Sequence, residues 1–309
     1  MTGCSTSRAA PQCDTAEVHV RLLRLFASPS YRPPLLPAVA LEIMQLSRRP
    51  SATFEEVVAI LEHDPILAAK VLSIAQSVFY APRSPILSLK QATVRLGMKT
   101  LRDLVLEAAL KLRVFRVPGY EAAMERLARH STVTAYLMRA LCRQTAIEVE
   151  YAFLCGLLHD VGIAACLLAL SDDARREAIP FDALGTVLDE VHEEASGLIA
   201  RLWGLPAEIQ QVAGTHHQLM VGGTPHPVNA AVIVAEQLAC ELDAGVAAQP
   251  DAGDSSGRRP LDVNPPEVFA AACDALGFDG HRIDAARTEA AEIVKTLSCP
   301  APVAAAAAR

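Results

Sequence analysis

Five histidines and two carboxylates are the residues of this 309-residue chain that could do chemistry together. The most conspicuous are His159 and Asp160, side by side in the apolar stretch LLHDVG (157–162). An imidazole nitrogen beside a carboxylate oxygen forms a mixed ligand set suited to Fe, Mn or Zn. A buried histidine hydrogen-bonded to an aspartate is also a common structural pair, so the doublet alone leaves both interpretations open.

The other candidates lie in segments with helical patterns on both sides of the doublet. They are His130 in HSTVTAYLMRAL, His192 in DEVHEEASGLIARLWGLP, His216 and His217 in VAGTHHQ, and Glu236 in NAAVIVAEQLAC. A lone histidine is more often a satisfied core or surface residue than a ligand, but an unpaired carboxylate in so apolar a helix would be costly to bury. Together the seven side chains can ring one cavity of a helical bundle.

The elements that must position these residues are helices with legible ends. Side chains suited to cap a helix N-terminus precede four of the predicted helices, and they are Thr53, Asp64, Ser88 and Asn264. Thr53 forms a capping box with Glu56. Gly97 and Gly277 are placed where two of the helices should end.

Apolar residues recur every three or four positions, as in Val57, Ile60 and Leu61, which is the period of an amphipathic helix. Several alternating segments joined by hairpin signals are not found, so the sequence predicts an all-α fold of about a dozen helices. Neighbours on a helix point about 100° apart. His159 and Asp160 are therefore expected to reach one wall of a cavity but not one spot.

Composition excludes several classes of protein. A formal charge of −7 argues against a nucleic-acid binder that relies on overall charge. The eight cysteines are scattered without a Cys-x-x-Cys pair, which indicates reduced thiols and a cytoplasmic location. The N-terminus lacks the apolar region of a secretory signal, and no uninterrupted apolar run reaches about 18 residues, so no membrane span is expected.

Changes of composition divide the chain into five parts. Residues 1–13 and 299–309 are predicted to be disordered ends. A two-lobed helical domain is expected over 14–242, with an N-terminal lobe at 14–116 and a second lobe at 117–242. The stretch AAQPDAGDSSGRRP marks a flexible linker, placed at 243–262, and a helical pair is predicted over 263–298.

The order His, His-Asp, His, His-His and a late acidic residue resembles the HD superfamily of metal-dependent phosphohydrolases. Within it, residues 22–240 are similar to the HDOD domain, the HD-related output domain of bacterial signalling proteins. The resemblance rests on Asp64-Pro65, AAKVLSIAQS, VRLGMKTLRDLV, AFLCGLLHDVG and the WGLP that ends at Pro206. It implies a two-lobed helical architecture whose second lobe is an HD-like bundle.

The same resemblance implies a candidate ligand set for a divalent metal, Fe, Mn or Zn, made of His130, His159, Asp160, His192, His216, His217 and Glu236. The chain departs from the HD-GYP phosphodiesterases, which have Lys where Ile163 stands; that Lys would suit a phosphate oxygen. The Gly-Tyr-Pro signature is missing after His217, and Glu236 replaces an Asp.

The sequence is consistent with two functions. The first is a non-catalytic regulatory module of the HDOD type, with no catalytic residues, which transmits a signal to a signalling protein in trans. The alternative is a metal-dependent phosphohydrolase of cyclic dinucleotides or nucleotides, in which His159 and Asp160 would be catalytic. An intermediate hypothesis is a site that binds metal or a nucleotide without turnover and signals by its occupancy.

Overall fold

The computed structural model describes residues 15–46, 49, 51–77, 79–80, 86, 88–172, 178–246 and 264–298. The predicted disordered ends at 1–13 and 299–309 lie outside these residues, as does the predicted linker from 247 onward. Over the described residues the regular structure is helical except for a short antiparallel hairpin, β1 (Met220–Val221) and β2 (Thr224–Pro225). The predicted all-α class is confirmed.

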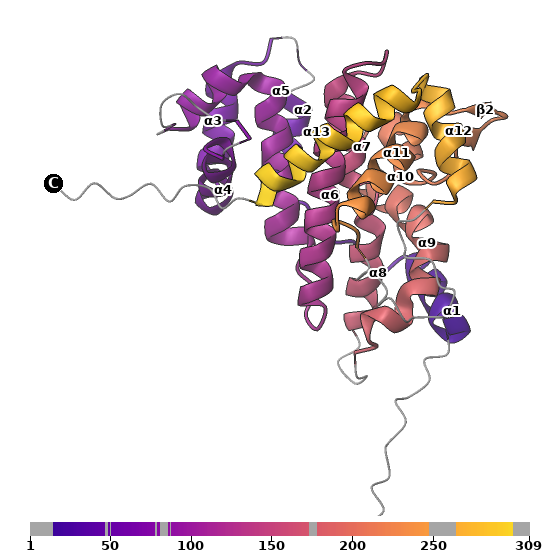
Figure 1. Ribbon diagram of the computed structural model, residues 1–309. Helices are drawn as coiled ribbons and strands as arrows, with labels where there is room; N and C mark the ends of the chain where they lie inside the picture. Colours follow the sequence, from indigo (N-terminus) through magenta and orange to yellow (C-terminus); the bar gives the residue numbers. More distant parts are fainter. Residues whose placement is uncertain are drawn as a thin grey trace, which may run out of the picture.

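The first lobe consists of α2 (Ala38–Leu46), α3 (Phe54–Glu62), α4 (Pro65–Ala75) and α5 (Leu89–Ala109), which continues into a π-helical turn at Leu110–Val114. The second lobe consists of α6 (Glu121–Cys142), α7 (Val149–Leu158), α8 (Val161–Ser171), α9 (Phe181–Leu202), α10 (Ala207–Ala213) and α11 (Pro227–Glu241). A C-terminal pair follows, α12 (Pro266–Leu276) and α13 (Gly280–Ser298). In Figure 1, α13 crosses in front of α6 and α11, against which it packs.

Local capping chemistry sets the starts of three first-lobe helices, as the sequence predicts. The side chains of Thr53, Asp64 and Ser88 each accept a hydrogen bond from a backbone N–H in the first turn of α3, α4 and α5, respectively. Thr53 and Glu56 form the complete capping box. These bonds satisfy N–H groups that have no partner within the helix.

Gly97 does not end its helix as simply as predicted. It has φ +79° and ψ 165°, so the helical path is broken there, but a second helical run starts at the next residue and continues α5 to Ala109. Glycine adopts this positive φ without the steric cost that a side chain would impose. Gly97 is therefore the kink within α5.

Helix α1 (Thr15–Phe26) packs on the second lobe, although the sequence places it with the first. Val18 and Leu22 are buried, and α1 contacts α8 and α9. His19 Nδ1 lies 2.6 Å from Oε2 of Glu190 in α9. Figure 1 shows α1 beside α9, on the far side of the molecule from α3 and α4. The apolar face of α1 therefore packs against α8 and α9, which are distant in the chain, and not against the helices that follow it in the sequence.

Buried charges join the two lobes where α5 meets α6 and α7. Arg139 of α6 donates from Nη2 to Asp103 Oδ2 of α5 at 2.9 Å, and its guanidinium lies 4.0 Å from the ring centroid of Phe153. Tyr136 donates to Glu107 Oε2 at 3.2 Å. Burial raises the pKa of Asp103 to about 6, although two arginines oppose the shift. Because these contacts connect α6 to α5, a change in the position of α6 would displace side chains of the first lobe.

Helices α7 and α8 together are long and apolar enough to cross a membrane. By that criterion residues Val149–Ser171 stand out, but 94% of their most apolar window is buried inside the protein. The stretch is interrupted by a buried imidazole and carboxylate at the α7–α8 junction. These are the properties of a core helix pair, and the pair brings the His-Asp doublet into the centre of the second lobe.

Candidate metal centre

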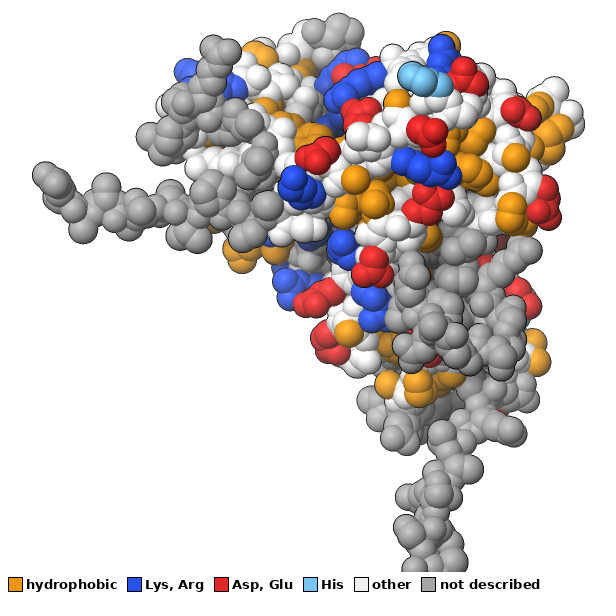
Figure 2. All heavy atoms as spheres, in the orientation of Figure 1, with side chains coloured by type: hydrophobic (Ala, Val, Ile, Leu, Met, Phe, Trp, Pro, Cys, Tyr) orange, Lys and Arg blue, Asp and Glu red, His pale blue; other side chains and the backbone are white. Residues whose placement is uncertain are grey.

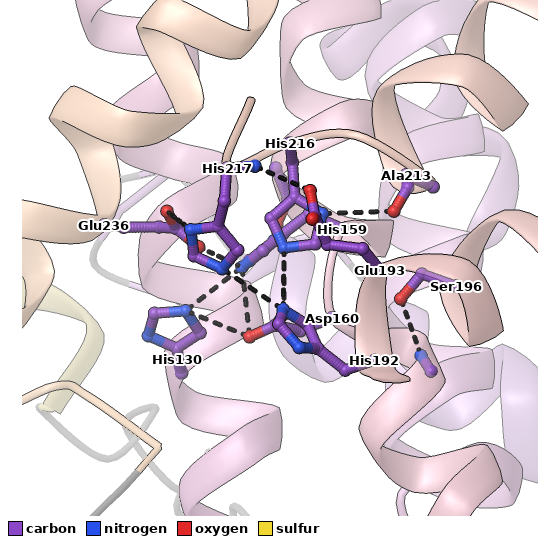
Figure 3. Close-up of polar contacts among 12 residues, drawn as sticks. His130, His159, Asp160, His192, Glu193, Ser196, Ala213, His216, His217 and Glu236 are labelled. Atoms are coloured by element: carbon purple, nitrogen blue, oxygen red, sulfur yellow. Dashed lines mark hydrogen bonds and ion pairs between the residues drawn. The ribbon is translucent and has the colours of Figure 1, made fainter. Parts of the chain in front are cut away.

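All seven predicted ligands meet in one place inside the second lobe (Figure 3). They come from five parts of the chain: His130 from α6, His159 and Asp160 from the α7–α8 junction, His192 from α9, His216 and His217 from the turn after α10, and Glu236 from α11. Six of the seven are buried, and the His217 side chain is 20% exposed.

The doublet lies between two helices rather than within one. His159 caps the C-terminus of α7, and Asp160, with φ −100° and ψ 13°, precedes α8. This break turns the two side chains toward each other, so that His159 Nε2 lies 3.2 Å from Asp160 Oδ2. The expectation that the two could reach a common wall but not a common spot is therefore wrong, because it assumed a continuous helix.

The ligands form two groups, each with its ligand atoms within 4.8 Å of one another. The first group contains His130, His159, Asp160 and Glu236, and the second contains His192, His216 and His217. Asp160 faces both: Oδ2 lies 3.5 Å from His130 Nε2, and Oδ1 lies 3.3 Å from His216 Nε2. One carboxylate thus stands between two sets of imidazoles, as a bridging ligand of a two-metal centre would.

The orientation of the imidazoles is set by backbone carbonyls. The Nδ1 atoms of His130, His159, His192 and His216 lie 3.0, 2.8, 2.8 and 3.0 Å from the carbonyl oxygens of Ala244, Gly156, Leu188 and Ala213. A carbonyl oxygen can only accept, so Nδ1 carries a proton and Nε2 is the nitrogen that faces the centre, where it can bind a metal ion or a second proton. This is the arrangement of metal-binding histidines, whose second nitrogen is held by an outer partner.

The inward nitrogens are too close together to be stable without a cation. Nε2 of His130 lies 3.1 Å from Nε2 of His159, and Nε2 of His192 lies 3.2 Å from that of His216. Two lone pairs facing each other at hydrogen-bond distance repel unless a proton or a metal ion lies between them. The donor set therefore fits a pair of divalent metal ions.

The two carboxylates of the centre also require a nearby cation. Asp160 Oδ1 and Glu236 Oε1 are buried and, among the described residues, accept no hydrogen bond. Such groups are costly in a protein interior. Imidazole nitrogens lie 3.3 Å from each oxygen, His216 Nε2 from Asp160 and His159 Nε2 from Glu236. The two carboxylates require positive charge at this point, and nitrogen-rich surroundings suit Fe, Mn or Zn better than Mg or Ca.

Charge coupling within the centre overcomes burial. Burial disfavours charge on His159, but the carboxylates of Asp160 and Glu236 raise its pKa well above the usual value. Burial also opposes ionisation of Glu236, yet His217 and His159 lower its pKa to about 2. His159 and His216 likewise hold the pKa of Asp160 well below its usual range. The cation that balances the carboxylates can thus be a proton on His159 or a metal ion.

Ser196 and Gly162 hold α9 against the doublet, although neither belongs to the predicted ligand set. The Gly162 N–H donates to Ser196 Oγ at 2.8 Å, and Ser196 lies one turn after His192 on α9. A Cβ on Gly162 would lie 2.5 Å from Ser196 N and closer still to the His192 carbonyl oxygen. The signal in the sequence was the spacing of four residues that places Ser196 beside His192 on one helix face.

Gly162→Ala is expected to destabilise the protein by about 3 kcal/mol, because the methyl group forces α8 away from α9. Chemical denaturation of the metal-free protein would measure the loss. Gly185→Ala on α9 is the matched control, since a Cβ there meets nothing within 4 Å. It should be neutral or gain about 0.5–1 kcal/mol from helix propensity. Equal stabilities of the two variants would refute the close contact at Gly162.

Comparison with known proteins identifies the family. The family model of the HDOD domain matches residues 34–219, so this chain belongs to the HDOD family. Glu236 lies beyond the matched residues, although it joins the first ligand group. Comparison with curated proteins finds no match.

Several solved structures share the fold. One is an inferred metal-dependent phosphohydrolase from Shewanella amazonensis SB2B, with a TM-score of 0.67, 17% identity and coverage of 91% of this chain and 98% of that one. Another is an HDOD domain protein with unknown function from Geobacter sulfurreducens (TM-score 0.63, 22% identity, 91% and 98% coverage). A third is an inferred signal transduction protein from Marinobacter aquaeolei VT8 (TM-score 0.61, 21% identity, 94% and 66% coverage).

Proposed function

We propose that this HDOD protein is a signalling module that binds two divalent metal ions in its second lobe and does not hydrolyse a phosphodiester. The observation that carries the proposal is a seven-residue ligand set that is complete but enclosed, with His217 its one partly exposed member. A phosphodiester must reach the metals to be cleaved. Metal ions alone can be held by buried side chains.

Ile163, three residues after Asp160, supports a role without turnover. Ile163, where HD-GYP enzymes have Lys, is buried in the apolar body of α8 with 1% of its surface exposed. An isoleucine cannot bind a phosphate oxygen, whereas a lysine there could do so as a point charge. The chain has the residues that suit a metal and lacks a lysine that would suit a phosphodiester substrate.

Two metal ions bound here would be held by distinct sets of residues. His130, His159, Asp160 and Glu236 would hold the first, and His192, His216 and His217 would hold the second, with Asp160 shared. Metals in such sites supply Lewis acidity in enzymes. In a regulatory protein they stabilise the state in which the ligand groups are assembled.

Helix α6 offers a route from the centre to the first lobe. It carries His130 in the first ligand group and, farther along, Tyr136 and Arg139, which contact Glu107 and Asp103 of α5. A rigid helix shifted at one end moves side chains at the other, and buried ion pairs have few alternative arrangements. Metal occupancy would thereby bias the orientation of the lobes and the surface offered to a signalling partner in trans.

The second candidate is a metal-dependent phosphohydrolase acting on cyclic dinucleotides or nucleotides. What favours it is the number and geometry of the ligands, which exceed what one structural metal needs. The fold is also that of a Shewanella protein named as an inferred metal-dependent phosphohydrolase. In this role, the metals would stabilise charge on the phosphoryl oxygens, and nucleotide would have to enter beside His217.

One experiment separates these functions. The protein is purified after expression with Fe, Mn or Zn, its metal content is measured, and it is incubated with cyclic di-GMP and with nucleotides. We expect about two bound metal ions per chain and no turnover. Hydrolysis that is abolished by His159→Ala would overturn the non-catalytic role and favour the second candidate. A protein that takes up no metal under any of these conditions would contradict both.

A further inference from the structure

Asn264 is a buried amide outside the ligand set that contacts both ligand groups. It is 7% exposed and is followed by Pro265 and α12. The sequence predicts it as the N-cap of that helix, but its side chain makes no capping bond; Pro265 occupies the N-cap position. The Asn264 amide turns instead toward the centre. The capping prediction is wrong because the amide of Asn264 bonds the buried carboxylate of Glu236 and the imidazole of His217 instead of the backbone of α12.

The two ends of the Asn264 amide meet different groups. Its Nδ2 donates to Glu236 Oε2 at 3.3 Å, and its Oδ1 lies 3.4 Å from His217 Nδ1. Glu236 belongs to the first ligand group and His217 to the second. An amide is the side chain that can donate at one end and accept at the other.

Each contact leaves the ligand atom that a metal needs facing the centre. With Oε2 held by Asn264, the other oxygen of Glu236 points to His159 Nε2, 3.3 Å away. With Nδ1–H of His217 directed at an oxygen, its Nε2 points to His192 Nε2 at 3.1 Å. His217 Nδ1 also lies 3.5 Å from Glu236 Oε2, so without the amide the imidazole and the metal would compete for one carboxylate.

The C-terminal pair holds Asn264 in this position. A residue before proline is restricted to extended backbone, which limits the ways Asn264 can move. Helix α12 packs on α11, the helix that carries Glu236, and α13 packs on α6, the helix that carries His130. On the face shown in Figure 2, acidic, basic and hydrophobic side chains are mixed over the part of the molecule where α13 lies. Asn264 and both helices lie beyond residues 34–219, which match the family.

We propose that Asn264 is a positioning residue that joins the two ligand groups, so that the C-terminal pair is an integral part of the metal centre. The proposal rests on metal binding in the proposed function. It makes two metal sites depend on a residue that would bind neither ion. Removal of an outer partner of metal ligands lowers metal affinity by roughly 10–100-fold.

The test uses the full chain and Co²⁺, whose visible absorption reports ligand geometry. Metal-free wild type and metal-free Asn264→Ala are titrated with Co²⁺. The control is Gln237→Ala, which also removes a side-chain amide, but one whose hydrogen bond is to Glu241 at the surface. We expect two Co²⁺ ions in wild type and in the control. In Asn264→Ala both ions should bind roughly 10–100-fold more weakly. The unfolding temperature of the metal-free protein should fall by only about 2–8 °C, the effect of one lost buried hydrogen bond.

The outcomes separate this inference from the proposed function. Wild type without bound Co²⁺ would overturn the metal site and, with it, the role of Asn264. Wild type with two ions and Asn264→Ala with unchanged affinity would overturn the role of Asn264 alone, as would a loss confined to one ion. A lower unfolding temperature with unchanged affinity would make Asn264 a packing residue. Asn264→Ser carries the same expectation should the alanine variant not fold.

Discussion

Replacing Asp160 with Asn is expected to remove both metal ions, lowering the metal content from about two ions per chain to near zero. The reason is geometric: Asp160 Oδ2 faces His159 of the first ligand group, and Oδ1 faces His216 of the second, at 3.2 and 3.3 Å. An asparagine withdraws the negative charge from both. Its NH₂ group can also donate to a neighbouring Nε2, which satisfies a lone pair that a metal would otherwise take.

Elemental analysis of proteins purified side by side measures the effect of Asp160→Asn. The control is Asp189→Asn, which neutralises an exposed carboxylate on α9, one turn before His192. The control should retain the metal content of wild type. A full equivalent of metal in Asp160→Asn would show that one group binds without Asp160, and the shared carboxylate would then have no bridging role.

Removing the metals from wild type is expected to lower its unfolding temperature by roughly 15–30 °C. A ligand at about 1,000 times its dissociation constant stabilises the folded state by about 4 kcal/mol, so two sites contribute about 8 kcal/mol. In a chain of this size each kcal/mol corresponds to about 2–4 °C. Within the metal-free centre, inward nitrogens such as those of His130 and His159, 3.1 Å apart, are left facing each other.

Scanning calorimetry of chelator-treated and reloaded protein tests this expectation. Zn²⁺ or Mn²⁺ should restore the unfolding temperature, whereas Mg²⁺ should not, because Mg²⁺ prefers oxygen ligands and five of the seven candidates here are imidazoles. The shift should vanish in Asp160→Asn. An unfolding temperature that is the same with and without metal would mean that the histidine cluster is a packing feature of the core.

Local sequence was sufficient to predict several elements of the first lobe. The capping residues Thr53, Asp64 and Ser88 lie where predicted, because a cap depends on backbone groups two or three residues away. The confirmed all-α class was also predictable from short-range patterns, because apolar residues that recur every three or four positions indicate helices. At Gly97 the local signal was correct about the break in helical geometry but not about the end of the helix, since α5 resumes after Gly97 and continues to Ala109.

The sequence by itself determined which side chains were available to the centre, because residue type and order restrict the chemistry to nitrogen- and oxygen-bound metals. Tertiary structure alone decided that they converge. Helix crossings bring His130 and Glu236 to the doublet. The carbonyl of Ala244, 114 residues away in the chain, orients the imidazole of His130. Asn264 bonds Glu236 instead of capping its helix. Local patterns report contacts between near neighbours in the chain, whereas a ligand set is closed by residues that only packing of the whole fold brings together.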